Sequence, residues 1–66
     1  MSFEAPQDWY FTFGVGHEQS GCYVKIHGTW AEARDEMFKR YGARWSMQYD
    51  SALAAGVERW NLKEVQ

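Results

Sequence analysis

Apolar residues recur at every second position in two stretches of the chain, residues 9–15 and residues 22–27. Side chains of a β-strand point alternately to opposite faces, so a period of two predicts a strand in each stretch. Residues 16–21 between them are polar and bounded by glycines, which is typical of a hairpin loop, so we expect an antiparallel ribbon. One face of this ribbon carries Trp9, Phe11, Phe13, Val15, Cys22, Val24 and Ile26, and its second face carries Tyr10, Thr12, Gly14, Tyr23, Lys25 and His27.

The hydrophobic period becomes helical after the second strand. Thr29 and Glu32 match a capping box, in which each side chain accepts a hydrogen bond from the other residue's backbone amide. Apolar residues then recur at helical spacing, with charged residues largely outside that stripe, and Gly42 is typical of a helix end. The sequence therefore predicts a main helix between Thr29 and Gly42, with an apolar stripe of Trp30, Ala33, Met37, Phe38 and Tyr41.

Residues 43–50 alternate again, which predicts a third strand. Asp50 or Ser51 can cap a short second helix that ends near Asn61, and residues 62–65 favour a short edge strand. The expected order is ββαβα, with a final β as an option. We therefore expect an α+β fold, an antiparallel sheet of three or four strands packed with one main helix and one short helix.

Length and composition limit the classes of function. Sixty-six residues form one domain, placed at residues 9–66 behind a flexible N-terminal arm of residues 1–8. A chain of this size buries only about 60% of its unfolded surface, which leaves little room for an elaborate active site. With one cysteine and no secretory signal at its start, the chain is expected to be a reduced cytoplasmic protein. No apolar run approaches the roughly 20 residues that cross a bilayer, so we expect no membrane-spanning segment.

Charge and aromatic content refine this picture. The formal charge of −2 argues against a protein that coats DNA through bulk positive charge. A basic cluster of Arg34, Lys39, Arg40 and Arg44 surrounds the main helix, although neighbouring acids offset part of it. The chain has four each of Trp, Tyr and Phe, more than so small a core can use. Some aromatic side chains should therefore lie at the surface, where Trp and Tyr favour interfaces.

The hairpin region contains both histidines and the only cysteine, but their spacing does not favour a chemical site. Cys22 and His27 are five positions apart on one predicted strand, so their side chains leave opposite faces, and His17 lies in the loop. Zinc needs three or four converging ligands, and a thiol nucleophile needs an adjacent base. The glycines here match neither common phosphate-binding fingerprint. We therefore expect no metal, no cofactor and no enzymatic activity.

The second face of the ribbon is the more informative surface. It places the rings of Tyr10 and Tyr23 beside Lys25 and His27. Such a face can stack on single-stranded bases, lie under a helix or contact a protein partner. Because the chain is acidic and this face has one lysine, a protein interface or a covering helix is favoured over nucleic acid.

The order of motifs resembles that of a group of small proteins encoded in phages and prophages. The motifs are FTFGVGH, GCYVKIHGT, EAR, MF and W followed by QY, and the resemblance covers nearly the whole chain from Trp9 onward. The resemblance implies that the protein is of phage origin. It does not indicate an activity or a functional residue. Small phage proteins without catalytic equipment often act by stoichiometric binding to a host protein, as anti-CRISPR proteins do.

The resulting hypothesis is a non-enzymatic inhibitor that binds a host defence protein, such as a Cas effector or another defence nuclease, in the host cytoplasm. Exposed aromatic residues would anchor the partner, and acidic residues would complement basic protein grooves. The alternative is a small nucleic-acid-binding accessory protein that uses the second face. A homodimer that buries one sheet face also accounts for the aromatic content. The candidate partner-binding residues are Trp9, Tyr10, Glu18, Tyr23, Lys25, His27, Trp30, Asp35, Glu36 and Trp60.

Overall fold

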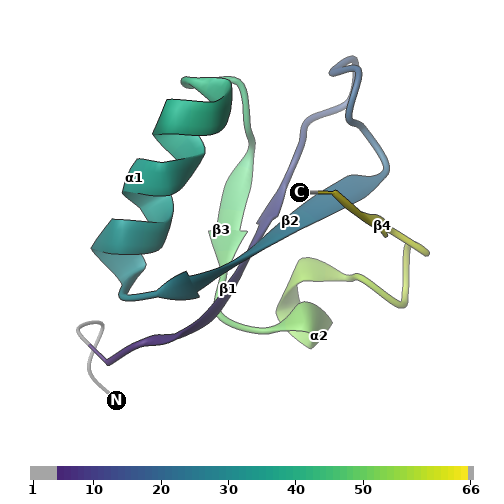
Figure 1. The fold of residues 1–66 in the computed structure, drawn as a ribbon. Helices are drawn as coiled ribbons and strands as arrows, with labels where there is room; N and C mark the ends of the chain where they lie inside the picture. Colours follow the sequence, from purple (N-terminus) through teal and green to yellow (C-terminus); the bar gives the residue numbers. More distant parts are fainter. Residues whose placement is uncertain (1–4, 66) are drawn as a thin grey trace.

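The computed structural model describes residues 5–65 and confirms the α+β class. Four strands form one sheet, accompanied by a long and a short helix, and the optional C-terminal strand is present (Figure 1). The elements are β1 (Gln7–Thr12), β2 (Cys22–Gly28), α1 (Trp30–Tyr41), β3 (Met47–Tyr49), α2 (Ala52–Ala55) and β4 (Lys63–Val65).

The sheet order is β3-β1-β2-β4, with β1 antiparallel to both β2 and β3. The predicted ribbon has the expected register, in which Tyr10 lies opposite Lys25 and Phe11 opposite Val24. The expectation of a wholly antiparallel sheet was wrong, because β4 pairs parallel to β2. The reason is the connection: the chain reaches β4 from β3, at the opposite edge of the sheet, rather than through a hairpin.

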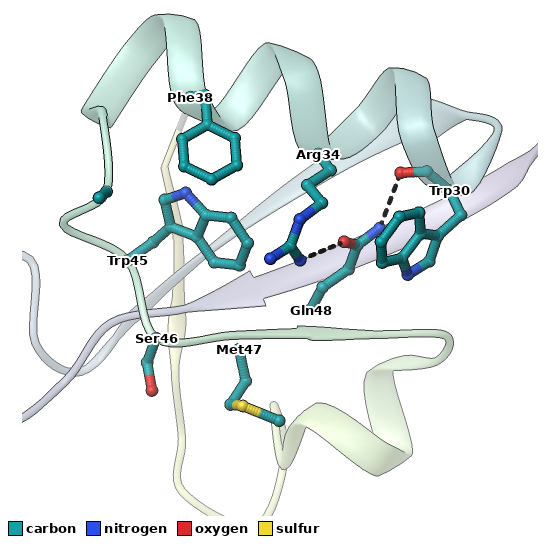
Figure 2. A pocket seen from close by; sticks show the side chains of 8 residues that line it. Trp30, Arg34, Phe38, Trp45, Ser46, Met47 and Gln48 are labelled. Carbon is teal, nitrogen blue, oxygen red and sulfur yellow. Dashed lines mark hydrogen bonds between the residues drawn. The ribbon is translucent and has the colours of Figure 1, made fainter.

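The two helices lie on opposite sides of the sheet. Since β2 and β3 both run antiparallel to β1, α1 belongs to a crossover from β2 to β3, and α2 belongs to the return crossover from β3 to β4. Two crossovers of the same hand that run in opposite directions place their helices on opposite faces. Figure 2 shows α1 on one side of the strands and α2 on the other. The second face is therefore partly covered by α2, which packs against β1 and β3.

The hydrophobic core fills the space between the sheet and α1. Its buried members are Trp9, Phe11, Phe13, Val24, Ala33 and Met37, with Ile26, Tyr41, Trp45 and Val65 packed around them. Val15 was predicted to join this face but is fully exposed, because β1 ends at Thr12 and Val15 belongs to the hairpin loop.

Local capping signals set the limits of the main helix. The Glu32 amide donates to Thr29 Oγ1 at 3.1 Å and the Thr29 amide donates to Glu32 Oε1 at 2.9 Å, which confirms the capping box. Gly42 ends α1 with its amide bonded to the Phe38 carbonyl. The second helix is shorter than predicted, because Gly56 adopts φ 78° directly after Ala55 and caps it.

The strand ends also differ from the sequence-based boundaries. β1 begins at Gln7, two residues earlier than predicted, so part of the expected arm of residues 1–8 is strand, and residues 1–4 lie outside the described residues. β3 covers only Met47–Tyr49 of the predicted residues 43–50. The residues before it therefore form a loop that links α1 to the sheet edge.

Candidate functional site

Trp9 is not an exposed anchor, which corrects its place among the candidate partner-binding residues. Its side chain is only 4% exposed and belongs to the core between the sheet and α1. The indole Nε1 donates to the Gly28 carbonyl at 3.0 Å. A side chain that is buried in the core and satisfied at its one polar atom cannot reach a partner.

The structure brings four other candidates together on the second face. The ring centroids of Tyr10 and Tyr23 are 5.9 Å apart, and Lys25 lies directly across from Tyr10. His27 Nδ1 lies 3.0 Å from a carboxylate oxygen of Asp8. This second face is therefore aromatic, with an exposed lysine and a histidine paired to an acid.

A second acid on this face comes from β4. The Tyr23 hydroxyl donates to Glu64 Oε1 at 3.3 Å. Partial burial and the nearby Glu64 carboxylate raise the pKa of Tyr23 above its ordinary value. Sequence reasoning missed Glu64 because the pairing of β4 with β2 is not a local property. With Asp8 and Glu64 on the same face as Lys25, this face is less suited to phosphates than its sequence indicated.

The remaining candidates do not form one site. Glu18 is exposed in the hairpin loop, and Trp60 is exposed with its ring close to Gly56. On α1, Asp35 is exposed, while Glu36 accepts from Arg40 Nε at 2.9 Å. Trp30, at the start of α1, belongs to a separate groove between α1 and β3.

The ring of His17 is held within the hairpin loop, and Cys22 lies in β2. The His17 ring stacks on Phe13 with centroids 4.8 Å apart, and His17 Nδ1 accepts from the Gln19 amide at 2.9 Å. Cys22 and His27 lie near opposite ends of β2. Within residues 5–65, no three His, Cys, Asp or Glu side chains are grouped so that they could hold a metal ion.

A groove of about 380 Å³ lies between α1 and β3, and we call it the α1–β3 groove (Figure 2). One wall consists of side chains from three successive turns of α1. The other wall is the loop after α1 and the outer edge of the sheet. The lining residues are Trp30, Arg34, Phe38, Ala43, Trp45, Ser46, Met47 and Gln48.

Arg34 occupies the centre of this groove. Its guanidinium carbon lies 4.9 Å from the Trp45 ring centroid, 5.0 Å from that of Trp30 and 5.6 Å from that of Phe38. All three distances are within the range of a cation–π interaction. Trp30, Arg34 and Phe38 meet because residues four apart lie one above another on a helix. Figure 2 shows the guanidinium pointing from α1 toward Trp45 and Gln48.

Gln48 links Arg34 to the start of the helix. Gln48 Oε1 accepts from Arg34 Nη1 at 3.4 Å, and Gln48 Nε2 donates to the Trp30 carbonyl at 3.1 Å. Gln48 lies opposite Phe11 in the β1–β3 register, so its side chain is on the α1 side of the sheet. The amide orients Arg34 without neutralising its charge.

Arg34 makes no ion pair within residues 5–65, where the ion pairs join His27 to Asp8 and Arg40 to Glu36. A guanidinium has five N–H donors in a planar fork, and Gln48 accepts one of them. The side chain is partly buried, where charge-assisted hydrogen bonds are less screened than in open solvent. The α1–β3 groove is therefore suited to a ligand that brings a carboxylate between aromatic walls.

Trp45 completes the inner wall and has one unsatisfied atom. Its ring packs edge-on against Phe11 at 5.2 Å and against Phe38 at 5.5 Å. Among the described residues, Trp45 Nε1 is buried without a hydrogen-bond partner, and it lies on the side of the ring that faces Phe38 (Figure 2). Trp45 was predicted to lie in a strand and Arg34 in a basic cluster around the main helix, so this groove was not predicted from the sequence. The Trp30, Arg34 and Phe38 spacing was the signal present in the sequence.

No protein-family model matches the chain, and neither a curated protein nor a solved structure gives a significant match. The resemblance to phage-encoded proteins therefore stays a prediction. Neither helix within residues 5–65 has the length and apolar character needed to cross a bilayer.

Proposed function

We propose that this chain is a non-enzymatic binding protein that acts stoichiometrically on another protein through the α1–β3 groove. The observation that carries the proposal is the geometry of Arg34, a guanidinium that lies among aromatic rings and has no carboxylate partner within residues 5–65. Trp30 is 37% exposed and Phe38 44% exposed, so both rings present apolar area to a partner. Aromatic and arginine side chains around a partly dehydrated centre are the residues that dominate binding energy at protein interfaces.

The charges around the groove favour a protein partner over a nucleic acid. Glu32 and Asp35 line an adjoining hollow together with Trp30 and Arg34. A strand of nucleic acid carries a phosphate at every nucleotide and would place several of them near these carboxylates. A protein segment can bring a single carboxylate to Arg34 and apolar groups elsewhere.

The resemblance to phage-encoded proteins supports a narrower version of this proposal. In that version the partner is a host defence protein, a Cas effector or another defence nuclease, and binding in the host cytoplasm inhibits it. Occupation of a functional surface needs no catalytic group in the inhibitor. The alternative, a small nucleic-acid-binding accessory protein, would use Lys25 and the tyrosines of the second face.

A pull-down with matched variants tests the proposal. Tagged wild-type protein, Trp30→Ala and Leu53→Ala are used as baits in nuclease-treated lysate from bacteria with active defence systems. Leu53 is the control because it is 90% exposed and belongs to α2, on the other side of the sheet. We expect one defence protein near one-to-one with wild type and Leu53→Ala, and its loss with Trp30→Ala, with far-ultraviolet circular dichroism showing that the Trp30→Ala chain is still folded.

The captured protein is then purified and its nuclease activity is titrated with each variant. The proposal predicts inhibition that is complete near equal molar amounts and lost with Trp30→Ala. Recovery of nucleic acid without nuclease treatment, reduced by Lys25→Ala but not by Trp30→Ala, would replace the proposal with the accessory-protein alternative. Turnover of a substrate by the chain itself would contradict both.

A further inference from the structure

We infer that the α1–β3 groove binds an extended peptide segment of its partner, which pairs with the free edge of β3 and places one carboxylate against Arg34. The inference rests on the proposed function and specifies the chemistry of the partner. It joins two independent features of the groove, the backbone at the edge of the sheet and the charge on its helical wall.

The backbone feature is the outer edge of β3. Within residues 5–65, β3 is the terminal strand of the sheet and pairs with β1 alone. The Ser46 amide donates to the Thr12 carbonyl at 2.8 Å, so the backbone groups of Thr12 point toward β3. Because backbone groups alternate along an antiparallel ladder, those of Met47 and Tyr49 also face β1, whereas the N–H and C=O of Gln48 point away from it. An outward donor and acceptor at a sheet edge can pair with an added strand.

The spacing of the helical wall matches an added strand. Trp30, Arg34 and Phe38 are four residues apart, which separates them by about 6 Å along a helix. Alternate residues of a strand are about 6.7 Å apart. Figure 1 and Figure 2 both show α1 running alongside β3. Three successive inward side chains of an added strand would therefore face these three residues in turn.

The charge feature specifies the central side chain of that segment. The residue that faces Arg34 is acidic, because the guanidinium has donors left over and no carboxylate partner within residues 5–65. The residues two positions before and after it are apolar, since they face Trp30 and Phe38. Asp35 and Glu32 on the adjoining hollow disfavour further acids on the α1 side. The expected segment therefore has five residues. Its central residue is Asp or Glu, its first and last residues are apolar, and the second and fourth residues are unrestricted.

Affinity selection from two peptide libraries tests this inference. Both contain nine-residue peptides with acetylated and amidated ends and random sequence, except that the central residue is Glu in one and Gln in the other. We expect enrichment from the Glu library, with apolar residues two positions to either side. Replacing the central Glu of the best peptide by Gln should weaken binding to the wild-type chain about tenfold or more. The Arg34→Gln variant should lose this discrimination.

Backbone methylation tests pairing with β3. Single N-methyl groups are placed along the best peptide, and only those on alternate residues should abolish binding. The Gln48 amide should gain protection from hydrogen exchange in the complex. Equal binding of Glu and Gln peptides, enrichment from neither library or a methylation effect without alternation would overturn the inference.

The result separates this inference from the proposed function. If no peptide is selected but the captured protein still depends on Trp30, the partner presents a folded surface, and the inference fails while the proposed function stands. If the captured protein does not depend on Trp30, the proposed function fails as well. Self-association through β3, detected by sedimentation and abolished by Trp30→Ala, would make a second copy the occupant and overturn the inference.

Discussion

Replacing Arg34 by methionine should lower the free energy of unfolding, and this loss should be as large at high salt as at low salt. Three rings lie within 6 Å of the guanidinium carbon. A cation–π contact contributes about 0.5–1 kcal/mol at an exposed site, and three contacts to one cation are not additive, so the expected loss is about 1–2 kcal/mol. For a chain of this size each kcal/mol lowers Tm by about 4–8 °C. Methionine retains an unbranched chain, so the change removes mainly the charge and the planar group.

Arg40→Met is the matched control on the same helix. Arg40 bonds to Glu36 at 2.9 Å, and both side chains are more than a third exposed. Such i, i+4 pairs contribute about 0.3–0.5 kcal/mol and weaken with salt. Urea unfolding is followed by far-ultraviolet circular dichroism, which does not depend on the fluorescence of Trp30 or Trp45, at low and at high salt.

We expect the effect of Arg34→Met to persist at high salt and that of Arg40→Met to shrink. An Arg34→Met loss as small and as salt-sensitive as the control would mean that Arg34 is an ordinary solvated charge. The groove would then not have the preorganised cation on which the proposed binding rests.

Three further predictions test the fold around the two faces. Trp9→Phe removes the indole donor to the buried Gly28 carbonyl and should lower the free energy of unfolding, measured in urea, by about 1–3 kcal/mol. Gly56→Ala places a Cβ 2.5 Å from Trp60 Cδ1 at a position where φ is 78°. The substitution should therefore be less destabilising in a Trp60→Ala background, where the backbone strain alone should lower the free energy of unfolding by about 1–2 kcal/mol. A constant loss in both backgrounds would show that the ring is not in contact. Burial is the larger cause and the Glu64 carboxylate the second cause that raise the pKa of Tyr23 in the folded state. The neutral Tyr23 side chain therefore contributes its full stabilisation below the ordinary tyrosine pKa, and this contribution is lost as pH rises through the raised value. Above about pH 10, wild type should therefore lose stability more steeply than Tyr23→Phe, and equal slopes would contradict this.

The elements that depend on local pattern were predictable from the sequence. Alternation over residues 9–13 and 22–27 reflects a pleated ribbon, and the Thr29 and Glu32 capping box is a contact between residues three apart. The parallel pairing of β4 was not predictable in this way. Cys22 pairs with Lys63 across most of the chain, and nothing in residues 62–65 indicates which strand they join.

The groove was missed because it depends on tertiary packing. The apolar stripe of α1 was predicted correctly around Ala33 and Met37, but Trp30 and Phe38 lie at its edge and stay exposed. A charged residue between them is usually solvated. Arg34 instead lies across the rings because the loop after Gly42 brings Trp45 back toward the helix, and the length of a loop does not specify that path.

Photo-cross-linking from a groove position identifies which surface contacts the partner. Benzoylphenylalanine replaces Ser46, an exposed residue that lines the α1–β3 groove, or Leu53 on the other side of the sheet. Each tagged chain is irradiated in bacterial lysate, and the products are identified by mass spectrometry. We expect a single protein adduct from position 46 and none from position 53. A product from position 53 alone, or a nucleic-acid adduct in place of protein, would contradict the assignment of the groove as the binding site.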